Sequence, residues 1–98
     1  MLQVSVRFFT SLREITNKKE EILKFSEGAN VTVELVLKTL TQRYGQSFFK
    51  YVYNKKTKEV KGFLHFLING KSASTQNGLK TQLEDGDVLV ILPPVGGG

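Results

Sequence analysis

The stretch VTVELVLKTLTQRYG, residues 31–45, predicts a helix and decides which fold the flanking segments can form. Its apolar residues recur at the spacing of one helix face, and they are Val33, Val36, Leu37, Leu40 and Tyr44. Thr32 is suited to cap the amino end, and Gly45 is suited to close the carboxyl end. We therefore expect an amphipathic helix of about three turns that buries one stripe.

The segments before this helix predict two strands that it could cover. Residues 2–9, LQVSVRFF, alternate strictly between apolar and polar positions, apart from Phe9 on the otherwise polar face. This period of two is typical of a half-buried strand. Residues 20–25, EEILKF, predict a second strand, and residues 10–18 predict a turn or a short helical segment between the two.

The segments after the helix predict three further strands. Residues 62–71 form an apolar strand that ends in Asn69-Gly70, a strong hairpin signal, and residues 72–74 predict a short return strand. Leu79 and Leu83 indicate a small helical turn with its leucines inward, and residues 84–87, EDGD, indicate another turn. Residues 88–93, VLVILP, are so apolar that a central position in the sheet is expected. Residues 46–54 allow either a continued helix or an irregular wrap.

The resulting order, β-β-α-β-β-β, predicts an α+β protein with the β-grasp arrangement. In this arrangement one main helix packs on one face of a mixed sheet of four or five strands, and the last strand lies parallel to the first. We expect residues 1–92 to form a single domain and residues 93–98 to form a flexible carboxyl-terminal tail.

Composition narrows the classes of function. The chain has 98 residues, 40% of them hydrophobic, and no cysteine, which excludes disulfides, a cysteine nucleophile and thiolate metal sites. No apolar run approaches the roughly 20 residues of a membrane span, and the amino terminus lacks the features of a secretory signal. We therefore expect a cytoplasmic protein without membrane contact.

The net charge of +5 raises the alternative of a basic RNA-binding module. The lysines concentrate in residues 50–61, KYVYNKKTKEVK, where Tyr51 and Tyr53 interleave with them. Lysine without arginine favours a solvated loop, because specific recognition usually adds arginine. Nucleic acid is therefore the less favoured partner, and salt-sensitive RNA binding without the last glycines would reverse this view.

No catalytic set is recognisable in the sequence. His65 is the single histidine, and its apolar neighbours indicate a packed or exposed strand residue rather than a base. Glu84, Asp85 and Asp87 surround Gly86 without the later ligands of a calcium loop. We therefore expect no metal site and no enzyme activity in the isolated chain.

The ending PPVGGG, residues 93–98, is the unusual feature that remains. Pro93 and Pro94 stop the last strand and stiffen its exit, and Val95 follows them. Six residues reach at most about 20 Å when extended. Glycines without side chains can enter a narrow channel in any backbone conformation.

The chain resembles the ubiquitin-like sulfur carriers, and most of all the small subunit of molybdopterin synthase. The resemblance rests on VSVRFFTSLREIT, VTVELVLKTL, LINGK and LEDGDVLVILPPVGGG, which cover nearly the whole chain in order. Such proteins have the β-grasp fold and end in two glycines. This sequence differs by one additional glycine and by its lysine-rich insertion, and related protein modifiers also vary at the insertion.

The resemblance implies that the carboxyl terminus is the reactive group. An adenylating, E1-like enzyme would supply ATP and magnesium, so the chain itself would bind no cofactor stably. The Gly98 carboxylate would attack the α-phosphate, release pyrophosphate and form an acyl-adenylate, and sulfur transfer would then give a thiocarboxylate. Gly97 and Gly96 would enter the partner's channel with it, and either Gly98 or a trimmed Gly97 is the working terminus. The thiocarboxylate would donate sulfur in the large catalytic subunit of molybdopterin synthase.

The resemblance also implies a docking surface on the last strand. Leu89 and Ile91 would point into the core. The residues expected to bind partners are Arg7, Phe9, Val88, Val90, Leu92, Pro93, Pro94 and Val95. The chief alternative is a ubiquitin-like modifier whose activated Gly98 is passed to lysines of target proteins through isopeptide bonds. Both hypotheses predict total loss of function when the last two glycines are deleted.

Overall fold

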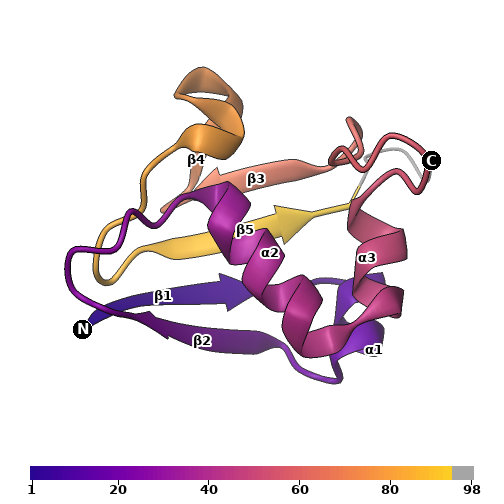
Figure 1. Cartoon of the computed structure of the whole chain (residues 1–98), viewed down its shortest axis with the longest axis horizontal. Coiled ribbons are helices and arrows are strands. Elements are labelled where there is room, and N and C mark those ends of the chain that lie inside the picture. Colours follow the sequence, from indigo (N-terminus) through magenta and orange to yellow (C-terminus); the bar gives the residue numbers. More distant parts are fainter. Residues whose placement is uncertain (94–98) are drawn as a thin grey trace.

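The computed structural model, which describes residues 1–93, has a mixed sheet of five strands in the order β2-β1-β5-β3-β4. The strands are β1 (Leu2–Arg7), β2 (Glu20–Phe25), β3 (His65–Ile68), β4 (Lys71–Ser72) and β5 (Val88–Leu92). β5 lies parallel to β1 and antiparallel to β3, in the middle of the sheet. Both the predicted β-grasp arrangement and the central last strand are confirmed (Figure 1).

The main helix, α2 (Val33–Tyr44), crosses one face of this sheet (Figure 1). The Thr32 hydroxyl accepts a hydrogen bond from the Leu35 amide at 3.2 Å, which confirms the predicted cap. Gly45 follows the helix with a φ of 79°, a left-handed value that favours glycine. The predicted stripe is buried, except that Tyr44 at its end is half-buried.

Two shorter helices close one end of the sheet (Figure 1). The stretch that the sequence left open forms α3 (Gln46–Val52), which begins directly after Gly45 and buries Phe48 and Val52. The expected turn or helical segment after the first strand is α1 (Ser11–Thr16), which buries Leu12.

The core lies between α2 and the sheet face that it covers. Along β1, the residues Val4 and Val6 point into it, and Leu89 and Ile91 do so from β5. The alternation predicted for both strands is therefore confirmed, and it leaves the opposite sheet face uncovered by α2.

Four strand predictions need correction in length. β5 ends at Leu92, one residue before the predicted end at residue 93. β1 ends at Arg7 rather than at residue 9, and β3 occupies only His65–Ile68 of residues 62–71. The predicted strand at residues 72–74 is wrong beyond Ser72, because the chain turns into the 3-10 helix η1 (Ala73–Thr75). The Ser72 hydroxyl accepts a hydrogen bond from the Ser74 amide at 3.3 Å. This local bond stabilises a turn, which competes with continued strand pairing. A second 3-10 helix, η2 (Gly78–Lys80), contains Leu79, and Leu83 beyond it is buried as predicted.

Within residues 1–93, no helix is both long enough and apolar enough to cross a bilayer.

Candidate partner-binding face

The uncovered face of the sheet centres on β5. Leu89 and Ile91 are fully buried on the α2 side, whereas Val88, Val90 and Leu92 are only partly buried. The strand therefore presents three apolar side chains to the uncovered face of the sheet. This is the orientation predicted for them, and their role in docking stays a prediction.

The strands on either side of β5 extend this face. Val90 lies between Arg7 of β1 and Leu67 of β3, because it is paired with both. Leu92 is paired with His65, and both Arg7 and His65 are exposed. We call the residues Arg7, His65, Leu67, Val88, Val90 and Leu92 the open face.

Sequence reasoning missed Leu67, and it left the position of His65 undecided. The signal was present, since His65 and Leu67 alternate with the buried Phe66 and Ile68. Only the pairing of β3 with β5 places these two residues beside Val90 and Leu92.

The prediction that Phe9 extends the first strand is wrong. Phe9 lies beyond the end of β1, where the chain turns into α1, and its side chain is half-buried. The Arg13 guanidinium lies 5.3 Å from its ring centroid, so one side of the ring is already in contact with a cation.

The start of β5 is fixed by a network of side chains from two turns. Asn69, at a φ of 51°, accepts a hydrogen bond from the Val88 amide at 2.9 Å and donates one to Asp87 at 2.8 Å. The other Asp87 oxygen accepts the Glu84 amide at 2.7 Å. Asp85 accepts the Gln3 amide at 2.7 Å, so this turn is tied to β1 as well. Asp85 and Asp87, which lie in the turn that the sequence predicted for residues 84–87, thus accept hydrogen bonds.

The predicted tail begins directly after the end of β5. Leu92 is the last strand residue, and partly buried Pro93 follows it. The predicted tail residues Pro94, Val95, Gly96, Gly97 and Gly98 lie outside the described residues.

A cluster of ionisable side chains lies between β2 and α2, two strands away from β5. The Glu21 carboxylate accepts a hydrogen bond from Tyr44, and it lies 3.3 Å from Lys18 Nζ and 3.3 Å from an Arg43 nitrogen. Burial alone raises the pKa of Glu21, but these hydrogen bonds and the Lys18 charge hold that pKa below its ordinary value. Burial, together with the Glu21 bond, raises the pKa of Tyr44 to about 12. Every charge here has a partner, so the cluster is explained as a structural one.

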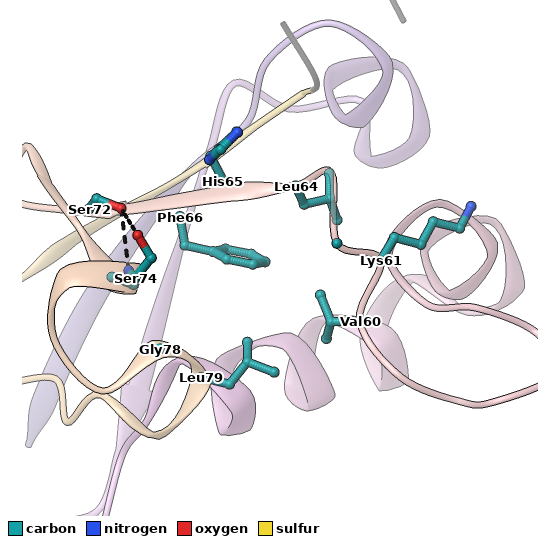
Figure 2. A pocket seen from close by; sticks show the side chains of 11 residues that line it. Val60, Lys61, Leu64, His65, Phe66, Ser72, Ser74, Gly78 and Leu79 are labelled. Carbon is teal, nitrogen blue, oxygen red and sulfur yellow. Dashed lines mark hydrogen bonds between the residues drawn. The ribbon is translucent and has the colours of Figure 1, made fainter.

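An apolar cleft of about 220 Å³ lies beside β3 and the two 3-10 helices (Figure 2). Phe66, Leu64, Val60 and Leu79 supply its walls, and Ser72 and Ser74 at one side bond to each other at 2.8 Å. Apart from His65, no residue of the open face lines this cleft.

Over residues 1–93, no group of three or more metal-ligating side chains comes together. His65 stands on the sheet beside Leu92, and the acidic turn residues are used by backbone amides and Asn69.

The sequence profile of the ThiS family matches residues 6–98. The chain belongs to the ThiS family. Small archaeal modifier protein 3 of Haloferax volcanii is 31% identical over 97 residues, which are 99% of this chain and 100% of that protein.

Two solved structures support the same relationship. The solution structure of small archaeal modifier protein 1 from Methanosarcina acetivorans is 35% identical with a TM-score of 0.82, covering 100% of this chain and 98% of that one. A chain in the crystal structure of the Amycolatopsis orientalis BexX/CysO complex is 28% identical with a TM-score of 0.72, covering 97% of this chain and 99% of that one. The predicted membership among ubiquitin-like sulfur carriers and modifiers is confirmed.

Proposed function

We propose that this ThiS-family protein is a sulfur carrier activated at Gly98, and that it serves as the sulfur-carrying subunit of a molybdopterin synthase. The proposal rests on the position of β5 in the sheet and on the place where this strand ends. One central strand displays Val88, Val90 and Leu92 on the open face and ends directly before the PPVGGG stretch. The six residues after Leu92 span at most roughly 20 Å when extended. A partner that binds the open face would therefore have its active site within that distance of the end of β5.

The chemistry divides between this chain and its partners. An oxygen of the Gly98 carboxylate bonds to the α-phosphorus of ATP and expels pyrophosphate, which converts a poor acyl donor into an acyl-adenylate. Hydrosulfide from the sulfur donor then attacks the acyl carbon and expels AMP, and loss of the sulfur-bound proton leaves a thiocarboxylate. The activating enzyme supplies ATP, magnesium and the catalytic groups, and this chain supplies the acyl group and the surface that positions it.

Glycine at the last positions has a steric purpose in this scheme. A side chain at residue 97 or 98 would obstruct entry to the active sites of both the activating enzyme and the large catalytic subunit. The absence of cysteine from the chain is compatible with sulfur carried on the terminus itself.

Transfer of the activated Gly98 to lysines of other proteins is the second candidate function. It is favoured by the similarity to two proteins that are named small archaeal modifier proteins. The two functions share the adenylation step and differ in the acceptor, which lies outside this chain.

A single incubation distinguishes the two candidates. The protein is mixed with its cognate activating enzyme, ATP, magnesium, a sulfur donor and cell extract. Intact mass spectrometry of the sulfur carrier shows one oxygen replaced by sulfur, whereas a modifier gives ladders on other proteins in a gel. Addition of the large catalytic subunit and the precursor pterin then tests for pterin sulfuration.

The decisive variant replaces Gly97 and Gly98 by alanine. We expect it to lose adenylation, measured as ATP-dependent pyrophosphate exchange. The matched control is Gly62→Ala, because a Cβ at Gly62 meets no atom within 4 Å and its φ is not left-handed. Normal adenylation and normal pathway rates in the Gly97→Ala/Gly98→Ala variant would overturn the proposal.

A further inference from the structure

The positive charge of this protein is concentrated in one short segment. Residues 50–61 contain five lysines and one glutamate, a net charge of +4, whereas the whole chain carries +5. The remaining residues are therefore nearly neutral. We call residues 50–61 the lysine hairpin.

The lysine hairpin is an ordered structure rather than a loose loop. Tyr53 and Val60 form an antiparallel bridge, and the Asn54 amide donates to the Glu59 carbonyl at 2.7 Å. The Asn54 side-chain oxygen accepts the amides of Lys56 at 2.9 Å and Thr57 at 3.2 Å. The charges are thus displayed on a fixed turn.

Lys58 occupies a position in this turn that disfavours lysine. Its φ is 65°, a left-handed value that glycine or asparagine adopts with less strain. Its ammonium lies 6.0 Å from the centroid of the Phe49 ring, which holds the charge beside α3. Lys58 therefore combines a strained backbone with a positioned charge, and strain of this kind is common at functional sites.

The lysine hairpin stands at the end of the sheet where β5 finishes. It leads into β3, whose first residue His65 is paired with Leu92, the last residue of β5. The Leu64 amide also donates to the Lys61 carbonyl at 3.3 Å, which keeps the hairpin close to that strand end. In Figure 1 the loop from α3 to β3 lies at the same end of the molecule as the arrowhead of β5.

Four of the lysines surround an open concavity of about 460 Å³, together with Tyr53 and Asn54. They are Lys50, Lys55, Lys56 and Lys61. The Lys61 ammonium donates a hydrogen bond to the Lys50 carbonyl at 2.7 Å, so the end of the lysine hairpin is joined to α3 across the concavity. Of these four lysines, Lys55 and Lys56 are exposed and line the concavity.

We propose that this basic concavity docks an acidic surface patch of the activating enzyme, beside the channel that receives the tail. The inference rests on the proposed function, since it assigns a second contact to the same partner. Carboxylates fit the site better than nucleic acid does, because the segment has no arginine for bidentate base contacts. Phe49 and Tyr53 are stacked on each other at 5.2 Å, which covers ring faces that bases would need.

Such a contact acts mainly on the rate of association. Exposed lysines attract an acidic surface over distances comparable to the Debye length of about 10 Å at 0.1 M salt. Charge complementarity of this kind raises the association rate constant and weakens as salt increases. The contact therefore brings the carboxyl end of β5 toward the enzyme before the open face is engaged.

The test compares two variants that remove the same charge. The hairpin variant is Lys55→Gln/Lys56→Gln, and the control is Lys24→Gln/Lys71→Gln, whose lysines are exposed at the opposite end of the sheet. Stopped-flow fluorescence measures association with the cognate activating enzyme without ATP, at low and at high salt. We expect the hairpin variant to associate roughly fivefold more slowly at low salt, with the difference lost at high salt, and the control to change less than twofold.

Equal slowing of the two variants, an unchanged salt dependence, or no association of the wild type overturns the docking proposal. A labelled single-stranded RNA is the second probe, and RNA binding lost only in the hairpin variant, with unchanged enzyme association, also overturns it. Intact mass after ATP addition separates this result from the proposed function. A wild type that associates with salt sensitivity but is never adenylated contradicts the sulfur-carrier proposal and leaves the docking contact supported.

Discussion

Tyr44 in the last turn of α2 donates a hydrogen bond to the carboxylate of Glu21 in β2, and so joins the helix to the sheet. Glu21 occupies a core-facing position next to the buried Leu23, and its side chain is only 9% exposed. The Tyr44 ring contacts Phe8 edge-on at 6.3 Å and stacks on Phe48 at 6.2 Å. One tyrosine therefore provides both apolar packing and the partner that a buried carboxylate requires.

The first prediction concerns Glu21→Gln. Removal of the charge leaves Lys18 and Arg43 without their shared partner, and we expect a loss of about 2 kcal/mol in the free energy of unfolding at pH 7, measured in urea. Because the folded pKa of Glu21 is lowered, its contribution is present above the ordinary value of 4.5 and is lost as pH falls through the folded pKa.

The control for this variant is Glu20→Gln, since Glu20 is the exposed neighbour in the same strand. It should change the stability by less than about 0.5 kcal/mol. A stability difference between wild type and Glu21→Gln that does not shrink in acid would contradict the assigned role.

The second prediction concerns Tyr44→Phe at alkaline pH. The pKa of Tyr44 is raised from 10.0 to about 12, so its neutral form stabilises the fold below pH 10 and that contribution is lost as pH rises through about 12. Wild type should therefore lose stability over this range, and Tyr44→Phe should show a smaller loss. Denaturant unfolding at a series of pH values measures the difference. An equally steep alkaline loss in both proteins would assign the effect to another group.

The third prediction separates strain from hydrogen bonding at Asn69. Asn69→Ala loses the two bonds to Val88 and Asp87 and also places alanine at a left-handed φ. We expect it to cost about 2 kcal/mol. Asn69→Gly loses only the bonds and should cost about 1 kcal/mol. Equal losses for the two variants, in thermal or urea unfolding, would show that backbone strain has no part.

The fourth prediction concerns the open face. Val90→Thr/Leu67→Thr places β-branched threonine on both paired strands but removes apolar contact area, and we expect binding to the activating enzyme to weaken about tenfold. Isothermal titration calorimetry measures the affinity. Ile22→Thr is the control, because Ile22 is 46% exposed on β2, separated from β5 by β1. If Ile22→Thr weakens binding as much as the double variant, the interface is not centred on β5.

The course of the chain could be predicted where one local signal was strong. The stripe of α2, the Thr32 cap, the alternation of β1 and the Asn69-Gly70 turn each specify their own conformation through neighbouring residues. The ends of β1 and β3 could not be predicted, because a ladder ends where its partner strand ends. Phe9 shows the consequence, since its alternation continues that of β1 although the strand has already ended at Arg7.

By itself, the sequence determined the order of the main helix and the strands, the face of each strand that is apolar, and a family resemblance that rests on four stretches along nearly the whole chain. Only the tertiary structure decided which residues share a surface. His65 and Leu67 lie beside β5, Glu21 meets Tyr44, and the lysine hairpin stands at the end of β5. The physical reason is that the spacing of apolar residues in a sequence reflects the local conformation of a few neighbouring residues. The pairing of distant strands depends instead on how the whole core packs.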